Sequence, residues 1–119
     1  MTLVDTSVWV NHFRKPDVAL SQLLTDGDAG MHPFIVGELA SGNLKDRTRS
    51  LGSFRSLPQA PVVDEAEVYY LLERYRLWGT GLGWVDLHVL AAAAVASWRL
   101  MTVHRAMDRA ATKIGIPRI

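Results

Sequence analysis

The sequence predicts an α/β domain in which helices cover a short, mostly parallel sheet on both faces. Short apolar runs that suit buried strands alternate along the chain with longer segments whose apolar residues recur at helical spacing. Strands that are separated by helices usually pair in parallel, because each helix carries the chain back across the sheet. At 119 residues the chain fits one domain, residues 1–119, and can bury about two thirds of its unfolded surface.

The amino-terminal part predicts two strands and three helices. The run TLV at residues 2–4 suits a buried strand, and the capping residues that open residues 5–14 indicate a helix. Residues 17–25 are expected to form a second helix, and a second strand is expected near residues 29–32. A third helix is expected at residues 34–42, where a Gly-Asn pair gives a common end signal.

The middle of the chain predicts two more helices around a loop. Residues 45–57 are expected to be helical and polar on one side, and residues 57–61 form the loop. Residues 64–78 carry apolar side chains at helical spacing, so one face of this helix is expected to pack on the core. That face consists of Val68, Leu71, Leu72 and Tyr75.

The carboxyl-terminal part predicts the most buried helix and the third strand. The glycine-rich segment 79–83 interrupts the chain before a helix at residues 84–97 that is apolar nearly all round. A strand is expected at residues 99–102 and a further helix at residues 106–114. The last three residues, 117–119, are a candidate for a short final strand.

Composition narrows the classes of function. The absence of cysteine excludes a disulfide framework, a zinc–thiolate site and a cysteine nucleophile, and it agrees with a cytoplasmic protein. The first residues lack the pattern of a signal peptide, and the longest apolar run is too short for a membrane span. A net charge of +1 does not by itself indicate a nucleic-acid-binding protein.

Three acidic residues stand inside apolar stretches. Asp5 ends the first apolar run, Glu38 interrupts the run HPFIVGELASG, and Asp86 opens the helix GWVDLHVLAAAAVA. A carboxylate that is buried without a partner costs several kcal/mol or becomes neutral. The simplest explanation is that the three acids converge around a cation at the carboxyl edge of the sheet, where α/β folds place their chemistry.

Each acid also has an ordinary structural explanation that the sequence leaves open. Asp5 could serve only as the N-cap of the next helix, and Asp86 could serve only to complement a helix dipole. Glu38 has no basic partner four residues away and could lie at a solvated edge. If the acids do cluster, their repulsion predicts that Asp5→Asn raises the stability of the metal-free protein.

Four motif blocks resemble those of PIN-domain ribonucleases, and most closely those of the VapC toxins of bacterial toxin–antitoxin pairs. The blocks are LVDTSVW, HPFIVGELASGNL, GLGWVDLHVLAAA and LMTVHRAM, and together they cover nearly the whole chain in order and spacing. The resemblance implies a PIN-like three-layer sandwich in which Asp5, Glu38 and Asp86 match three acids of the metal site. It also matches Ser7 to a hydroxyl beside the first acid and Thr102 to the threonine that closes the last motif strand.

One position departs from the family pattern. An acid or asparagine usually stands two residues after the threonine, but here that residue is His104, and the next acid is Asp108. Asp108 could reach the site from one helical turn away, or His104 could itself be a ligand and favour Mn²⁺ over Mg²⁺. His104 could equally be an ordinary loop histidine, so the departure bears on a second metal site rather than on the first.

The resemblance implies metal-dependent hydrolysis of RNA phosphodiester bonds. Asp5 and Asp86 are the expected ligands of Mg²⁺, or alternatively of Mn²⁺, while Glu38 would bind through water or orient the attacking water. Ser7 and Thr102 would orient the carboxylates or a water by hydrogen bonds.

An RNA substrate needs positive charge near an acidic site. One basic cluster lies in the middle of the chain, and a second lies near its carboxyl terminus. The clusters are Lys45, Arg47, Arg49 and Arg55, and Arg99, Arg105, Arg109, Lys113 and Arg118. Most of these residues are expected to be solvated. One of the four tryptophans, at positions 9, 78, 84 and 98, could stack on a base.

The resemblance also implies partners, and it leaves one alternative class of function open. A VapC-like protein is expected to bind a VapB-like antitoxin, whose carboxyl-terminal segment lies in a groove of the toxin, and to form a homodimer. A catalytically weak or silent PIN-like module that binds antitoxin or RNA is the alternative, which His104 favours. A nucleotide-binding domain is disfavoured because neither a P-loop nor G-x-G-x-x-G occurs.

Overall fold

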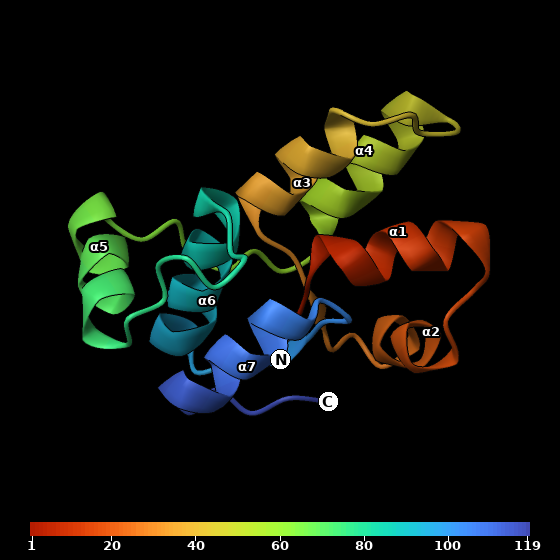
Figure 1. Cartoon of the computed structure of the whole chain (residues 1–119). Helices are drawn as coiled ribbons and strands as arrows, with labels where there is room; N and C mark the ends of the chain where they lie inside the picture. Colours follow the sequence, from red (N-terminus) through yellow and green to blue (C-terminus); the bar gives the residue numbers. More distant parts are fainter.

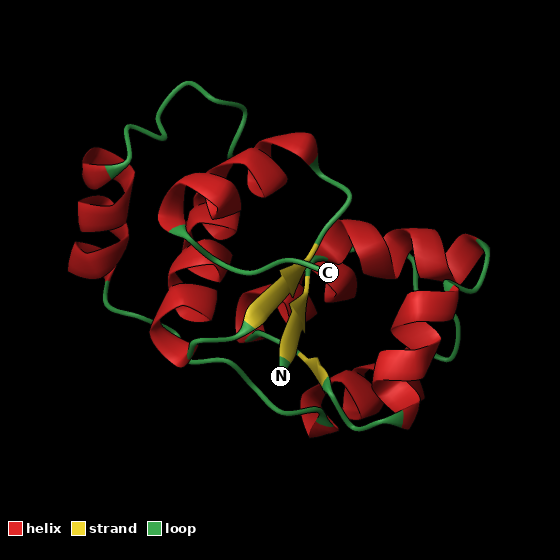
Figure 2. Ribbon diagram, turned by 90° about the horizontal axis from the view of Figure 1, so that it is seen from below, coloured by secondary structure: helices red, strands yellow, loops and turns green.

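The architecture is a three-stranded parallel sheet surrounded by seven helices, in a computed structural model that describes all residues, 1–119. The strands are β1 (Thr2–Val4), β2 (Ala29–Gly30) and β3 (Arg99–Met101), and they lie in the order β2-β1-β3. Figure 2 shows the strands at the centre of the molecule, with helices on both sides. The predicted α/β class and the parallel sheet are therefore confirmed.

The helices lie close to the predicted segments. Their bounds are α1 (Thr6–Arg14), α2 (Val18–Thr25), α3 (Pro33–Ala40), α4 (Arg47–Ser56), α5 (Glu65–Arg74), α6 (Trp84–Ala96) and α7 (Arg105–Ile114). Helices α3 and α4 pack together as a hairpin that rises from the body of the molecule (Figure 1). None of the helices combines the length and the apolar character that a membrane crossing requires.

Three predicted segments differ from the structure in more than the exact position of a helix end. The helix expected at residues 64–78 ends at Arg74, because Arg76 adopts the left-handed conformation with φ of 52°. The expected last strand is reduced to a single bridge between Leu100 and Arg118. The loop at residues 57–61 contributes a similar bridge, between Met31 and Gln59, which extends the pairing beyond β2.

The core forms one cluster of buried apolar residues around β1 and α6. All three residues of β1 are buried, as are residues 87–93 of α6. The strand β1 pairs with β2 on one side and β3 on the other, so its end is fixed from both directions. This places the residue that follows β1 at the centre of the carboxyl edge of the sheet.

A close contact between Gly30 and Trp98 fixes the packing at β2. A Cβ atom on Gly30 would lie 2.9 Å from Cε3 of Trp98, closer still to Cζ3, and 3.2 Å from the Thr2 carbonyl oxygen. Only glycine lets the indole lie against the strand in this way.

Candidate functional site

Asp5 is the centre of a hydrogen-bond network at the carboxyl edge of the sheet. Its backbone N–H donates to the Met101 carbonyl at 2.9 Å, and the residue is 4% exposed. Its Oδ2 accepts bonds from the hydroxyls of Ser7, at 2.7 Å, and Thr102, at 2.8 Å. Asp5 does stand at the N-cap position of α1, but its side chain makes no capping bond. Capping therefore does not explain this carboxylate.

The same two hydroxyls fix the loop that follows β3. The Val103 N–H donates to Ser7 Oγ at 3.2 Å, and the His104 N–H donates to Thr102 Oγ1 at 3.0 Å. Ser7 and Thr102 thus connect the start of α1 to the start of α7. The other carboxylate oxygen of Asp5, Oδ1, receives no hydrogen bond from the protein.

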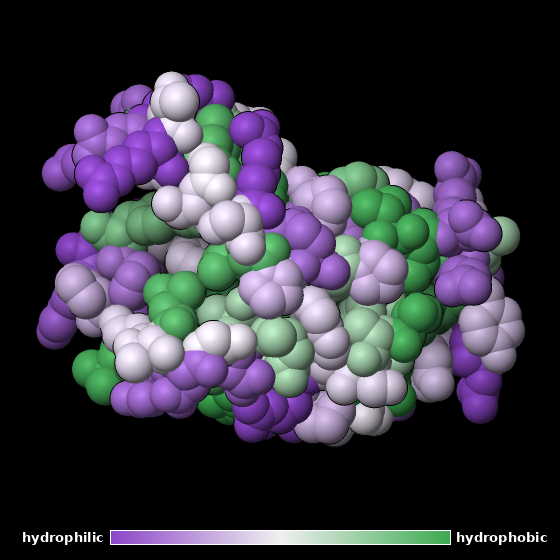
Figure 3. All heavy atoms as spheres, turned by 180° about the vertical axis from the view of Figure 1, so that it is seen from behind, coloured by the Kyte–Doolittle hydropathy of each residue, from purple (hydrophilic) through white to green (hydrophobic).

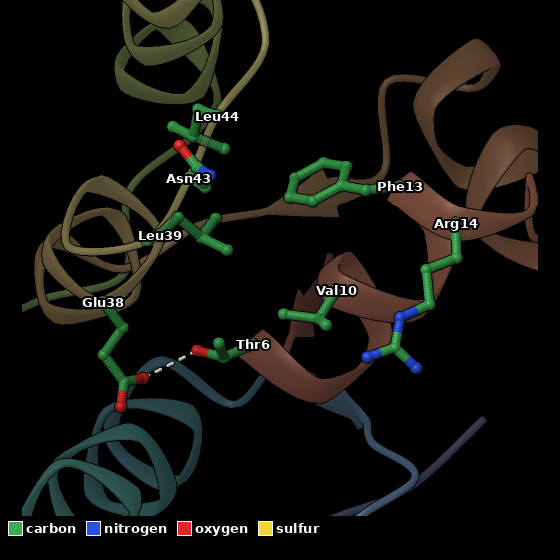
Figure 4. A pocket seen from close by; sticks show the side chains of 9 residues that line it. Thr6, Val10, Phe13, Arg14, Glu38, Leu39, Asn43 and Leu44 are labelled. Carbon is green, nitrogen blue, oxygen red and sulfur yellow. Dashed lines mark hydrogen bonds between the residues drawn. The ribbon is translucent and has the colours of Figure 1, made fainter.

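Glu38 lies beside Thr6, the neighbour of Asp5, although 32 positions separate Thr6 and Glu38 in the sequence. It is exposed on α3, and its Oε1 accepts a bond of 2.6 Å from the hydroxyl of Thr6, the residue that follows Asp5. Figure 4 shows this bond at one end of a pocket between α1 and the α3–α4 hairpin. The sequence prediction did not include Thr6 among the site residues. Its position between Asp5 and Ser7, two predicted site residues, could have identified it.

Asp86 lies in the first turn of α6, which packs against α3. It is partly buried, and its Oδ2 accepts a bond of 2.8 Å from the Gly83 N–H, so one oxygen stabilises the start of the helix. A role at the start of the helix therefore accounts for one of the two carboxylate oxygens of Asp86. Oδ1 receives no hydrogen bond from the protein.

The two residues considered for the fourth position lie at the start of α7 and in its first turn. His104 precedes this helix as its N-cap, is partly buried, and makes no side-chain capping bond. Asp108 is 54% exposed and pairs with Arg118, whose Nε lies 2.6 Å from Oδ1. Arg118 therefore already neutralises the charge of Asp108.

The three acids do not form a group of three or more side chains that could hold a metal ion by themselves. Each carboxylate is held by its own donor, namely a hydroxyl or a backbone N–H, and like charges repel without a cation between them. The donor set nevertheless fits a hard cation, since each acid keeps one oxygen without a protein partner. Mg²⁺ commonly retains several waters beside one or two carboxylates, so it does not need three direct ligands.

Two buried histidines lie where α3 and α6 meet. His32 Nδ1 accepts a bond of 3.0 Å from the Phe34 N–H, and the Phe34 ring lies between His32 and His88. Burial lowers the pKa of His32, the nearby His88 lowers it further, and the Pro61 carbonyl opposes both effects. Burial also lowers the pKa of His88, against the attraction of Glu65. The sequence reasoning assigned no role to this pair.

Comparison with known proteins identifies one family. The family model described as the PIN domain matches residues 2–113. Two proteins named Ribonuclease VapC32, from Mycobacterium tuberculosis strains CDC 1551 / Oshkosh and ATCC 25618 / H37Rv, are each 44% identical over 117 residues. The alignment covers 98% of this chain and 94% of each relative. A solved structure titled "Structure of FitAB bound to IR36 DNA fragment" has a similar fold, with a TM-score of 0.67 and 19% identity, and covers 100% of this chain and 94% of that chain.

Proposed function

Because the chain belongs to the PIN-domain family, we propose that it is a metal-dependent endoribonuclease and the toxin of a VapBC-type toxin–antitoxin pair. The main support for this proposal is the burial and hydrogen bonding of the Asp5 carboxylate. It is a buried carboxylate at the carboxyl edge of the sheet, fixed through one oxygen by two hydroxyls and free at the other. A carboxylate with no structural task at that oxygen is suited to hold a cation.

Each residue of the site has a separate task in the proposed reaction. Asp5 and Asp86 would hold Mg²⁺, or Mn²⁺, through their free oxygens, while Ser7 and Thr102 keep the Asp5 carboxylate in one orientation. The bound cation would activate a water and stabilise charge on the phosphate. Glu38, held by Thr6, would orient that water from α3.

The test of this function is cleavage of RNA by the purified chain, freed of any partner. We expect cleavage with Mg²⁺ or Mn²⁺, none with EDTA, and loss of most activity in Asp86→Asn. Asp108→Asn is the matched control, because it removes one charge from an exposed acid that is paired with Arg118. Equal RNA degradation by parent and Asp86→Asn would mean that the activity comes from a contaminant.

A catalytically silent module remains the second candidate, and one observation favours it. The family's usual fourth acid is replaced by His104, while Asp108 is occupied by Arg118. If the parent chain binds RNA or a partner but cleaves none of the RNAs offered with either metal, this candidate replaces the nuclease.

We propose that the pocket of Figure 4 receives the antitoxin. It is a cavity of about 330 Å³ between α1, α3 and the loop that follows α3. Its apolar lining consists of Val10, Phe13, Leu39 and Leu44, and Glu38 stands at one end. An antitoxin segment with apolar residues and a basic side chain would fill the cavity and neutralise Glu38. The test is binding of a VapB-like protein, which Val10→Glu should weaken, because Val10 lines the pocket and is 38% exposed.

We also propose that the chain forms a homodimer and acts in the cytoplasm, where its RNA substrate would be found. The aromatic residues Tyr69 and Trp84 are 50% and 41% exposed, and their ring centroids lie 5.0 Å apart. Adjacent exposed aromatic side chains are common at protein interfaces. Light scattering of the parent and of Trp84→Ser would test this proposal.

A further inference from the structure

The groove beside the acidic site continues into a second compartment with a different chemistry. This compartment has a volume of about 340 Å³ and lies between the end of α1 and the start of α4. Its lining consists of Phe13, Arg14, Asn43, Leu44, Lys45 and Ser50. Four of these residues also line the pocket that contains Glu38, so the two cavities form one groove.

The second compartment is positively charged. Arg14 lines it from α1 and Lys45 lines it from the loop before α4, and no acidic residue lines it. Neither side chain takes part in an ion pair, whereas Arg99 and Arg118 pair with Asp28 and Asp108. Two unpaired cationic side chains that line one cavity favour the binding of an anion there. Figure 3 shows hydrophilic side chains gathered over the α3–α4 hairpin, at the upper left. Lys45 belongs to the loop that joins these two helices.

The surroundings of these cations are fixed by local hydrogen bonds and packing. Ser50 Oγ donates to the Lys45 carbonyl at 2.8 Å, which holds the loop before α4. The Phe13 ring packs on Phe54, with centroids 6.0 Å apart, and remains 48% exposed. In Figure 4 this ring points from α1 toward Asn43 and Leu44. A held aromatic ring beside two cations is the combination that binds a nucleotide, because the base can stack while the phosphate is neutralised.

We propose that Arg14 and Lys45 bind a backbone phosphate of the RNA substrate, away from the bond that is cleaved, and that Phe13 stacks on an adjacent base. This inference rests on the proposed nuclease function, and it identifies where that function holds its substrate. The carboxylates of Asp5, Glu38 and Asp86 repel a polyanion, so nearby cations supply the attraction that lets the strand lie along the groove. Contacts of this kind bind ground state and transition state alike, so they lower KM and leave kcat unchanged.

The experiment measures RNA binding and cleavage in Arg14→Ala, Lys45→Ala and the double variant. The matched control is Lys15→Ala, which removes the same charge one residue after Arg14 but does not line the compartment. Binding is followed by the fluorescence anisotropy of a labelled single-stranded RNA of mixed sequence. All protein chains in this measurement also carry Asp5→Asn, so that the RNA is not cleaved. Thermal melting confirms that each variant is folded.

We expect each single variant to bind RNA about tenfold more weakly and to reduce the slope of log Kd against log salt by about 0.7. In chains with an intact Asp5, KM should rise by a similar factor at constant kcat, whereas Lys15→Ala should resemble the parent. The parent could cleave RNA while Arg14→Ala and Lys45→Ala weaken RNA binding no more than Lys15→Ala does. That result would refute the phosphate site and leave the proposed nuclease function intact.

Two other outcomes would also overturn the inference. If the parent neither binds nor cleaves RNA, the phosphate site and the nuclease function fail together. If the double variant keeps its affinity for RNA but loses affinity for an acidic peptide of a VapB-like antitoxin, the compartment is a site for the partner. Loss of RNA binding in Phe13→Ala, with retention in Phe13→Tyr, would support the stacking role.

Discussion

The substitution Asp5→Asn tests how the central carboxylate is stabilised before any cation binds. From the sequence alone, relief of repulsion among clustered acids predicts a gain in stability. The structure reverses this expectation, because the three acids do not form one close group of three side chains and Asp5 instead accepts two short hydroxyl bonds. A hydrogen bond to a charged group contributes about 1.5–3 kcal/mol, against about 0.5–1.5 kcal/mol for a neutral one.

Neutralising Asp5 should therefore lower the free energy of unfolding by about 2 kcal/mol, roughly 1 kcal/mol for each bond. With an unfolding entropy of about 2.1 cal/mol/K per residue, a chain of 119 residues should lose about 8 °C in Tm. The assay is thermal and urea unfolding at pH 7 in EDTA. Asp108→Asn is the control, since the exposed pair that it breaks is worth less than about 1 kcal/mol. Unchanged or raised stability of Asp5→Asn would show that repulsion among the acids dominates.

Three further predictions concern other parts of the fold. His104→Asp should restore the usual fourth acid, and calorimetry should then show tighter Mg²⁺ binding. Nuclease activity should be preserved or raised. No change in either quantity would mean that His104 takes no part in metal binding. Burial lowers the pKa of both His32 and His88 in the folded chain, so below about pH 6.5 the unfolded chain takes up protons before the folded chain does. The free energy of unfolding should therefore be largest above that pH. Below it, the free energy of unfolding should fall by up to about 1.4 kcal/mol per pH unit for each histidine. Urea unfolding at several pH values measures this slope, and His88→Gln should make it shallower; an identical slope would assign the acid sensitivity to other groups. Gly30→Ala should cost about 1–3 kcal/mol, because its methyl group would overlap the Trp98 ring, and an unchanged Tm would mean that the indole moves aside freely.

The arrangement of elements could be predicted from the sequence because it depends on local patterns. The alternation of apolar strands and amphipathic segments gave the parallel sheet, and the run around Asp86 gave the buried helix α6. The end of α5 was less accessible, since a left-handed residue at Arg76 carries no strong sequence signal. Boundaries of this kind depend on the packing of the following loop, which the sequence shows only indirectly.

The candidate site could be predicted in part. Asp5, Ser7 and Thr102 were grouped by resemblance, and the structure brings them into direct contact. The partner of Glu38, Thr6, could not be identified, because it depends on how α3 crosses α1. The two basic clusters were equivalent in the sequence. Only the structure shows that Arg99 and Arg118 have acidic partners while Lys45 has none. Long-range pairing of charges is a property of the tertiary fold, so no local pattern predicts it.

The bond between Thr102 and Asp5 joins residues that lie 97 positions apart. The strand β1 pairs with β3 across a similar separation in the sequence. Such distant pairing forms late, because the intervening chain must be ordered before the contact is gained. The carboxylate of Asp5 is therefore fixed only in the last stage of folding, and an unfolding event that separates β1 from β3 releases it before the rest of the core is lost.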